Sequence, residues 1–413
     1  MTAKSLLLIG AALVAAILIS YLATPLFIRL AHRIGWLDVP RDARRMHHHP
    51  IPLLGGLSII LAFFTVTIGV ALVLNTRDEP LLLHMLLQLT PGSLIIAFMA
   101  FWDDRYDLPP LPRLFIQCAA AGLTVAMGVR ISFVSASVRL FGKQTFGLGW
   151  LGIPITVLWI VGVTNAMNWI DGLDGLAAGI SSIASLSILA ISVLQPQPQV
   201  GVSVLTAALA GGCLGLLPYN IHPARVFMGD TGAMFLGFVL SVVSIQGLFK
   251  FYAAISFAVP LLVLGLPLFD TISAIFRRLA EGKSPFAADR SHIHHKLIDL
   301  GLSQKQAVLL LYATGIVLGV LGVVFTVFNT IIGWRFSVVS VLLVIAVFVS
   351  LLAIFRRRNV RAAERAEEAE DTCPPLPDKP PAPADGASAD QPENMPDTPG
   401  APSTGPSAQD GKN

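Results

Sequence analysis

The sequence predicts an all-α polytopic membrane protein with about eleven transmembrane helices. Hydrophobic residues make up 54% of the 413 residues and charged residues only 13%, whereas a soluble domain has about 25% charged residues. The mean hydropathy of the chain is +0.72. Its apolar residues are gathered into runs close to the roughly 20 residues that an α-helix needs to cross a bilayer. We therefore expect a protein integral to a membrane.

Eleven apolar runs are expected to form the spans of a membrane domain that covers residues 1–355. The first run is too long for the core of a signal peptide, so it is expected to remain as a span. The runs lie near residues 5–28, 53–74, 83–101, 111–129, 148–167, 175–194, 200–218, 231–249, 252–275, 306–328 and 334–355.

The composition changes after the last run. Residues 356–413 are first charged and then rich in Pro and Ala, and such a segment cannot bury a hydrophobic core. We expect a cytoplasmic tail that is largely disordered over residues 372–413, with a short helix as an option for residues 356–370.

The basic residues predict which side of the membrane each loop occupies. Nineteen Lys and Arg residues fall in the loops after spans one, three, five, seven and nine and at the start of the tail, against seven on the other side. We expect the N-terminus to face outward and the C-terminus to lie in the cytoplasm. The unusual polar motifs then all fall on the cytoplasmic face, which indicates a single site there. They are "RRMHHHPIPLLGG", "FWDDRYD", "NAMNWIDGLDG", "PYNIHPARVFMGD" and "SPFAADRSHIHHKL".

A pair of adjacent carboxylates ends the third run. Asp103 and Asp104 are neighbours and so point in different directions, which lets one face a metal while the other accepts a proton. With Asp107 they form a DDxxD spacing, which also occurs in enzymes that bind magnesium diphosphates. The alternative interpretation is a solvated helix end.

A second pair of carboxylates stands among glycines. Asp171 and Asp174 share one face if the segment is helical, and Gly172 and Gly175 let the backbone approach a ligand closely. A helix that begins here would attract an anion, so carboxylates beside it imply a cation or a hydrogen-bonding base. Helix capping is the alternative, but it explains only one of the two aspartates.

An aromatic residue and a histidine-rich loop complete the set. Phe227, three residues before Asp230, can stack on a flat base, although anchoring at the membrane interface is the alternative. His292, His294 and His295 lie in a strongly basic loop without a nearby cysteine, so a diphosphate suits them better than zinc. Carboxylates with magnesium would neutralise that diphosphate. At a membrane surface, these residues indicate phosphoryl transfer between a soluble diphosphate and a lipid.

With these motifs in this order, residues 20–330 resemble the polyprenyl-phosphate N-acetylhexosamine-1-phosphate transferase family. The segments that carry the resemblance are "PLLGG", "DDRYD", "NAMNWIDGLDGLAAG", "VFMGDTGAMFLG" and "SPFAADRSHIHHKL". Of these, "DDRYD" and "HIHH" are similar to the glycan-initiating branch. The resemblance implies transfer of N-acetylhexosamine 1-phosphate, by default N-acetylglucosamine 1-phosphate, from a UDP-sugar to undecaprenyl phosphate with release of UMP. The lipid diphosphate sugar would begin a cell-surface glycan such as O-antigen.

The resemblance also implies roles for individual residues. Many relatives carry a lysine after the aspartate pair, where this chain offers only an arginine. The implied site consists of the catalytic pair Asp103 and Asp104; the metal ligands Asp230 and Asn168, with Asp171 beside the metal; Asp174 and Phe227 around the uracil; Arg113, His292, His294 and His295 at the diphosphate or sugar; and His47 upstream of the Gly-Gly pair.

The resemblance implies Mg²⁺ as the cofactor, with Mn²⁺ as a substitute. The expected partners are a UDP-amino sugar, undecaprenyl phosphate and the lipid bilayer of the bacterial cytoplasmic (inner) membrane. No nucleic acid is expected, and a homodimer is compatible with these expectations.

Two other functions and two mechanisms are open at this point. A membrane prenyltransferase would use the DDxxD spacing, but it leaves the histidine loop and the Gly-Asp site unexplained. An ion-coupled transporter would place charges at mid-span, whereas the acids here cluster at span ends. Asp270, within a span, is interpreted either as a residue that supports the site residues or as a structural residue. For the transferase, we favour direct attack by the lipid phosphate over a covalent phosphosugar enzyme.

Overall fold

The computed structural model describes residues 1–39, 49–75, 81–136, 144–195, 197–249, 258–280, 282 and 292–332. The chain divides into two units, residues 1–348 and 349–413, and the described residues all belong to the first unit. The predicted eleventh span, the predicted tail and His47 lie outside the described residues.

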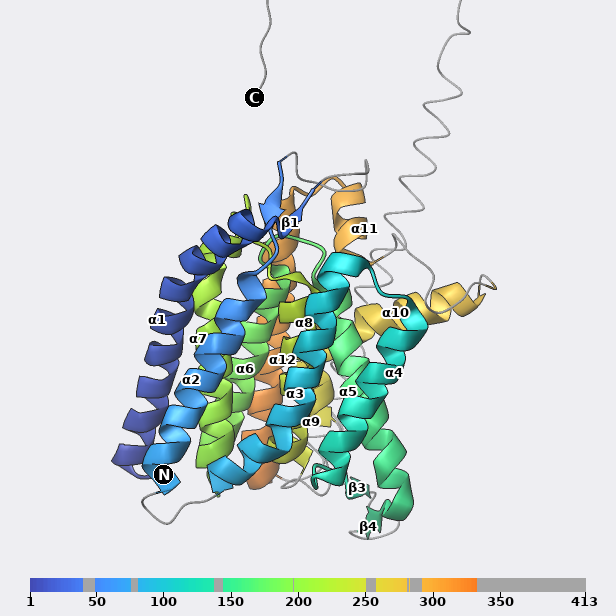
Figure 1. Ribbon diagram of the computed structural model, residues 1–413. Coiled ribbons are helices and arrows are strands. Elements are labelled where there is room, and N and C mark those ends of the chain that lie inside the picture. The colour runs from blue at the N-terminus through green and yellow to red at the C-terminus, as the bar shows by residue number, and fades with distance from the viewer. Residues whose placement is uncertain are drawn as a thin grey trace, which may run out of the picture. The chain divides into compact units, whose positions relative to one another are not determined.

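Long α-helices that run side by side make up most of the first unit (Figure 1). Among the described residues, eight helices are long and apolar enough to cross a membrane, and a slightly shorter helix, α4, stands at the predicted fourth span. The predicted all-α membrane fold is therefore confirmed, while the number of spans and the orientation stay predictions. The long helices are α1 (Ala3–Ile34), α2 (Gly55–Asn75), α3 (Leu81–Tyr106), α4 (Pro110–Ala126), α5 (Gly152–Ile170), α6 (Leu176–Leu194), α7 (Val200–Asn220), α8 (Gly229–Ser244) and α12 (Gln304–Ile332).

Short elements lie in the connections. Figure 1 places β1 and α11 at one end of the bundle, and the N-terminus with β3 and β4 at the other. The described parts of the predicted polar motifs lie at the end that carries β1 and α11 (Figure 1). The short elements are two antiparallel strand pairs, β1 (Leu37–Asp38) with β2 (Ile51–Pro52) and β3 (Phe133–Ala136) with β4 (Gln144–Gly147), and the short helices η1 (Gly149–Leu151), η2 (Ile245–Phe249) and α11 (Ile293–Asp299).

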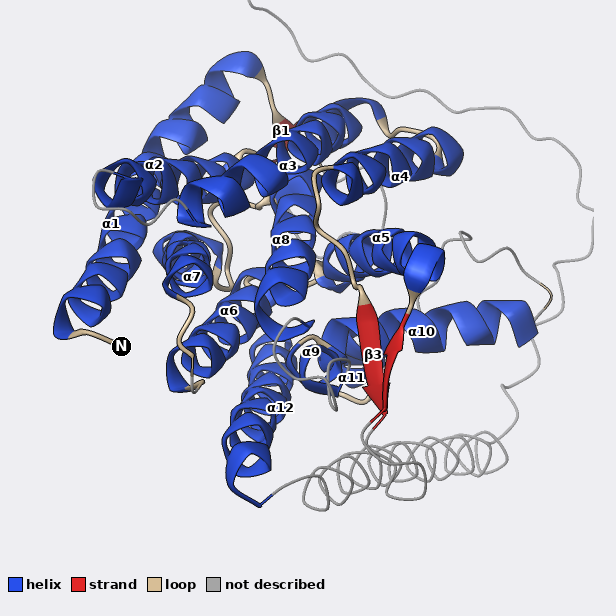
Figure 2. Cartoon of the chain, turned by 90° about the horizontal axis from the view of Figure 1, so that it is seen from below, coloured by secondary structure: helices blue, strands red, loops and turns tan. Residues whose placement is uncertain are grey.

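Helix α8 is the central helix in the view along the bundle (Figure 2). It packs against α2, α3, α5 and α6, and its side chains from Thr231 to Ser244 are buried. A helix that is apolar all round is expected in such an interior position. The N-terminus of α8 is therefore held among the ends of its neighbours, and Asp230 stands in its first turn.

The predicted ninth span, residues 252–275, is not one continuous helix in the described part. From residue 258 on, the chain forms α9 (Ala258–Val263) and α10 (Gly265–Ala280), and Figure 1 shows α10 lying across the direction of the long helices. Pro267 explains the division, because proline has no N–H for the carbonyl of Val263 and its ring crowds that carbonyl.

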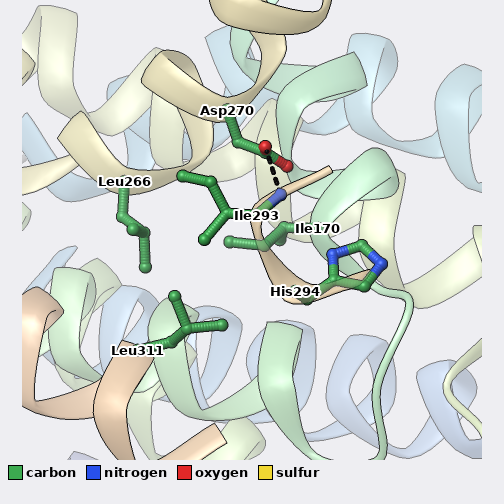
Figure 3. A pocket seen from close by; sticks show the side chains of 6 residues that line it. All are labelled: Ile170, Leu266, Asp270, Ile293, His294 and Leu311. Carbon is green, nitrogen blue, oxygen red and sulfur yellow. Dashed lines mark hydrogen bonds between the residues drawn. The ribbon is translucent and has the colours of Figure 1, made fainter. Parts of the chain in front are cut away.

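Helix α10 carries a carboxylate that binds the next helix. Oδ1 of Asp270 accepts the N–H of Ile293, the first residue of α11, at 2.8 Å (Figure 3). The N–H groups of a first helical turn have no partner in their own helix, so this bond fixes the start of α11. The interpretation of Asp270 as a structural residue agrees with this contact.

Candidate active site

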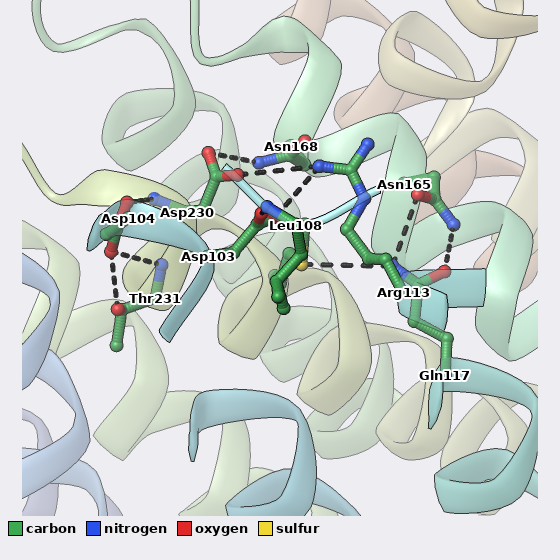
Figure 4. A network of polar contacts seen from close by, with 10 residues as sticks. Asp103, Asp104, Leu108, Arg113, Gln117, Asn165, Asn168, Asp230 and Thr231 are labelled. Carbon is green, nitrogen blue, oxygen red and sulfur yellow. Dashed lines mark hydrogen bonds and ion pairs between the residues drawn. The ribbon is translucent and has the colours of Figure 1, made fainter. Parts of the chain in front are cut away.

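Asp104, in the last turn of α3, accepts three hydrogen bonds from the first turn of α8 (Figure 4). Its Oδ1 accepts the N–H of Asp230 at 2.7 Å, and its Oδ2 accepts the N–H and the hydroxyl of Thr231 at 3.1 and 2.6 Å. Met228, which precedes α8, provides no side-chain cap. Because a carboxylate at a helix N-terminus also interacts favourably with the helix dipole, Asp104 fixes the start of α8 against the end of α3.

Gly229 makes this close contact possible. It begins α8 with a φ of +69°, a conformation that favours glycine. A Cβ at this position would lie 2.7 Å from Oδ2 of Asp104 and 2.9 Å from the carbonyl oxygen of Leu53. The glycine therefore lets Asp104 and the segment before α2 approach the start of α8.

Asp103 is buried, with 4% of the residue exposed, and both of its carboxylate oxygens have partners. Oδ1 accepts a hydrogen bond from the N–H of Leu108 at 2.7 Å, and Oδ2 accepts one from Nη1 of Arg113 at 2.8 Å. The same Nη1 lies 3.8 Å from Oδ2 of Asp230. One guanidinium thus compensates two carboxylates, and removing it would leave a buried charge unpaired.

Asp230 also contacts α5. Its Oδ1 accepts a hydrogen bond from Nδ2 of Asn168 at 2.8 Å. One turn earlier in α5, Asn165 exchanges two hydrogen bonds with Gln117 of α4, at 2.6 and 3.3 Å. Gln117 follows Arg113 by four residues, so this pair fixes α4 against α5 where Arg113 and Asn168 both reach Asp230. Gln117 was not predicted; its spacing from Arg113 along an apolar helix is the signal that could have found it.

Asp171 lies directly after α5 and is half-buried. Burial, followed by the negative charges of Asp230 and Asp174, raises the pKa of Asp171 to about 8 from an ordinary value of 3.8. The site therefore holds more negative charge than Arg113 balances. Within the described ranges, no group of three or more His, Cys, Asp or Glu side chains is arranged to hold a metal ion by itself.

Two glycines of "GLDGLAAG" lie directly against ring side chains of α11 and α12. A Cβ on Gly172 would overlap the imidazole of His294, and a Cβ on Gly179 would overlap the ring of Tyr312. The hydroxyl of Tyr312 donates to the carbonyl of Gly175 at 2.6 Å. The motif is therefore the surface on which α11 and α12 pack against the α5–α6 connection and the start of α6.

Asp174 faces the connection between α7 and α8. Its Oδ2 accepts Nδ1 of His222 at 2.8 Å and the N–H of Ala224 at 3.1 Å. His222 was not predicted, because nothing in the sequence around a single histidine indicates a partner 48 positions away. The role of Asp174 at the uracil, together with Phe227, stays a prediction.

The "PLLGG" segment fixes the backbone around Phe227, whose side chain is half-buried. The N–H of Phe227 donates to the carbonyl of Pro52 at 2.8 Å, and its carbonyl accepts the N–H of Gly55 at 2.9 Å. The carbonyl of Met228 accepts the N–H of Gly56 at 3.0 Å. This motif, at the start of α2, therefore positions the connection that carries Phe227 toward α8.

The histidine-rich segment is largely interior. Nδ1 of His292 lies 2.9 Å from Oδ2 of Asp270, and the ring of His294 stacks on that of His292 with centroids 5.8 Å apart. His294 is 2% exposed, and burial, followed by the neighbouring His295, lowers its pKa to about 3. His295 is half-buried. The crevice beside His294 has no room for a water molecule and is lined by Ile170, Leu266, Asp270, Ile293, His294 and Leu311 (Figure 3).

Comparisons with known proteins place this arrangement in a family. The glycosyl transferase family 4 model matches residues 86–248. A Bacillus subtilis (strain 168) protein named probable undecaprenyl-phosphate N-acetylglucosaminyl 1-phosphate transferase is 35% identical over 317 residues, which cover 76% of this chain and 84% of that protein. The chain belongs to the polyprenyl-phosphate N-acetylhexosamine-1-phosphate transferase family.

Two further relatives of this transferase family agree. The decaprenyl-phosphate N-acetylglucosaminephosphotransferase of Mycolicibacterium smegmatis is 35% identical over 374 residues, or 86% of this chain and 90% of that protein. The undecaprenyl-phosphate alpha-N-acetylglucosaminyl 1-phosphate transferase of Escherichia coli (strain K12) is 28% identical over 311 residues, or 73% and 81%. The similarity supports neither a membrane prenyltransferase nor an ion-coupled transporter.

In this member of the transferase family, the predicted site residues form one connected group only in part. Hydrogen bonds and ion pairs join Asp103, Arg113, Asn168 and Asp230 directly, and Asp104 through the backbone of α8. Of the other predicted residues that the structure describes, Asp171 directly follows α5, Asp174 and Phe227 lie on the α5–α6 and α7–α8 connections, and His292, His294 and His295 lie at the start of α11.

Proposed function

We propose that this protein transfers N-acetylglucosamine 1-phosphate from UDP-N-acetylglucosamine to undecaprenyl phosphate. The observation that carries the proposal is the meeting of Asp103, Arg113, Asn168 and Asp230 at one end of a membrane helix bundle. In the proposed reaction, an oxygen of the lipid phosphate attacks the phosphorus that bears the sugar. The bond from that phosphorus to UMP breaks, and UMP leaves with the bonding electron pair. The lipid diphosphate sugar would begin a cell-surface glycan.

Asp103 is the better candidate for the group that accepts the proton of the lipid phosphate. One of its partners is Arg113, whose long side chain can move to a phosphate and free Oδ2. Asp104 instead binds two backbone N–H groups and a hydroxyl of α8, which cannot leave without unwinding the helix end. We therefore assign proton transfer to Asp103 and the placement of Asp230 to Asp104. With Asp103 as the base, the proposed mechanism is direct attack rather than a covalent phosphosugar enzyme.

The oxygen atoms beside Arg113 fit a magnesium ion. Mg²⁺ prefers oxygen ligands and keeps several waters, so one or two protein ligands suffice. The amide nitrogen of Asn168 donates a hydrogen bond to Asp230. The amide oxygen of Asn168 can therefore bind a metal ion next to the Asp230 carboxylate. Asp230 and Asn168 would hold the ion, with Asp171 beside it, and Mn²⁺ would substitute. When bound, the ion would neutralise charge on the diphosphate of the donor.

The basic side chains complete the proposed donor site. Arg113 already lies between two carboxylates, and a guanidinium matches the geometry of a phosphate. Of the three histidines, His295 is the most exposed and is proposed to reach the diphosphate. His292 and His294 are proposed to support it, because both rings are buried against Asp270 and Gly172.

The proposed location is the cytoplasmic membrane of a bacterium, with the site facing the cytoplasm. The basic residues support this orientation, because they are concentrated on the side of the polar motifs. Ser303 is exposed at the start of α12 and tests it. A thiol reagent that cannot cross membranes should not label a Ser303→Cys variant of a cysteine-free chain in intact cells; labelling would overturn the orientation.

The activity is tested with the full-length protein purified in detergent. Radiolabelled UDP-N-acetylglucosamine and undecaprenyl phosphate should give a labelled lipid and an equal amount of UMP. EDTA should stop the reaction and Mg²⁺ should restore it, with UDP-N-acetylgalactosamine as the comparison donor. A folded protein that forms no labelled lipid from either donor would contradict the proposal.

A further inference from the structure

A single histidine joins the α5–α6 connection to the α7–α8 connection. Nδ1 of His222 lies 2.8 Å from Oδ2 of Asp174, and the N–H of Ala224 donates to the same oxygen at 3.1 Å. A carboxylate in its ionised form can only accept hydrogen bonds, so Nδ1 carries the hydrogen and the ring orientation is fixed. The other ring nitrogen takes no part in this bond.

The two side chains differ in their exposure. The side chain of His222 is 39% exposed and that of Asp174 is 16% exposed, so the imidazole lies on the solvent side of the carboxylate. A hydrogen bond to a charged group is strengthened when it is partly shielded from water. His222 and the N–H of Ala224 together therefore hold Oδ2 of Asp174 in one orientation.

A hydrogen bond within the α7–α8 connection stabilises it. Nδ2 of Asn220, at the end of α7, donates to the carbonyl of Val226 at 2.9 Å, which closes the connection into a compact turn. His222 lies inside this turn, and Phe227 directly follows it. The bond to His222 thus ties Asp174 to the same segment that carries Phe227.

We propose that His222 is a positioning residue for the donor nucleotide: it holds the carboxylate of Asp174 in the orientation that receives a uridine nucleotide beside Phe227. This rests on the proposed function, because it takes Asp174 and Phe227 as the two sides of the nucleotide subsite. His222 acts through Asp174, whereas the proton transfer is assigned to Asp103. Its loss therefore weakens donor binding without slowing the chemical step.

Three variants test this role. His222→Asn places its amide nitrogen close to the position of Nδ1 and keeps the donor to Asp174. His222→Gln places its amide nitrogen near the position of Nε2 and loses that donor, as does His222→Ala. The KM for UDP-N-acetylglucosamine and the inhibition constant of UMP should rise roughly tenfold in the Gln and Ala variants, as expected for loss of a hydrogen bond to a charged group. The Asn variant should stay within about threefold of the unmodified protein.

The kcat and the KM for undecaprenyl phosphate should not change in any of these variants. His32→Ala replaces an exposed histidine in the last turn of α1 and is the matched control. If the Ala variant fails to fold, the comparison between Asn and Gln carries the same information.

Direct binding of UMP to the full-length protein distinguishes a failure of the proposed function from a failure of the proposed role of His222. If the unmodified protein binds neither UMP nor the UDP-sugar, the proposed function itself fails. If it binds UMP, but the Gln and Ala variants bind equally well, the role of His222 is overturned and the function stands. Equal losses in the Asn and Gln variants, or a lower kcat with unchanged KM, would also overturn it.

Discussion

Asp104 and Thr231 are 127 positions apart in the sequence and are joined by two hydrogen bonds. Oδ2 of Asp104 accepts the hydroxyl of Thr231 at 2.6 Å and its N–H at 3.1 Å. The pair joins the end of α3 to the start of α8, directly beside Asp230. The position of a proposed metal ligand thus depends on a hydroxyl that has no proposed contact with substrate.

Replacing Thr231 by Val should lower both stability and turnover. Valine keeps the shape of threonine but removes one donor to the Asp104 carboxylate, and such a bond is worth about 1.5–3 kcal/mol. The unfolding temperature in detergent should fall, and kcat should fall with it because the adjacent Asp230 moves. Thr231→Ser keeps the hydroxyl and is the control. A Val variant as stable and active as the Ser variant would contradict the capping role.

Asp103→Asn should lower kcat by roughly 10²–10⁴-fold, the range typical of losing a general base. The second pKa of a phosphate monoester is near 6, so the acceptor loses its own proton at higher pH and this variant should recover partly. Asp104→Asn should not recover, because its defect is the placement of α8. The measurement is kcat against pH for both variants, with UDP-sugar affinity determined separately.

If kcat recovers at higher pH only in Asp104→Asn, then Asp104 is the proton acceptor and Asp103 has the positioning role. A flat and inactive profile for Asp103→Asn, with donor binding intact and a phosphosugar trapped on the unmodified protein, would instead establish the covalent mechanism.

Gln117 and Asn165 should be coupled energetically. Each amide is the partner of the other, so Gln117→Leu or Asn165→Leu alone leaves a polar group unsatisfied, at a cost of about 1–3 kcal/mol. The double variant should cost less than the sum of the single variants. Denaturation of the four proteins in detergent measures this difference. Strictly additive losses would show that the two side chains do not interact.

The metal-free protein should lose stability as the pH rises from about 4 to about 8. The pKa of Asp171 is about 8 in the folded protein, against 3.8 ordinarily. In this window the folded state therefore keeps a proton that the unfolded state releases, so the stabilising effect is present at low pH and is lost as the pH rises. Asp171→Asn should flatten the fall. Unfolding temperatures in EDTA test this, and parallel curves for the two proteins would contradict it.

Much of the fold could be predicted because its signals are local. Each apolar run can be identified within about 20 residues, and helices stand at the predicted positions for α1 to α8 and α12. The division between α9 and α10 was missed, because Pro267 lies in a run that stays apolar on both sides. A hydropathy profile does not show that Pro267 has no backbone N–H and therefore interrupts the helix.

The candidate site could be predicted where its chemistry is concentrated in short motifs. Asp103 and Asp230 stand in polar segments at the ends of spans, and the structure brings both to Arg113. Gln117 and His222 each stand alone in the sequence, and both of their partners lie 48 positions away. For Gln117, the four-residue spacing from Arg113 is the one local signal. The pair of His222 and Asp174 joins two connections between helices, so no local pattern could indicate it.

The central claim is that a sugar 1-phosphate, and not the sugar alone, moves to the lipid. UDP-N-acetylglucosamine with radioactive phosphorus in the phosphate attached to the sugar separates the two reactions directly. With the full-length protein, undecaprenyl phosphate and Mg²⁺, we predict that the label enters the lipid and that unlabelled UMP is released. Label recovered in UDP, with a sugar attached directly to the lipid phosphate, would contradict the claim.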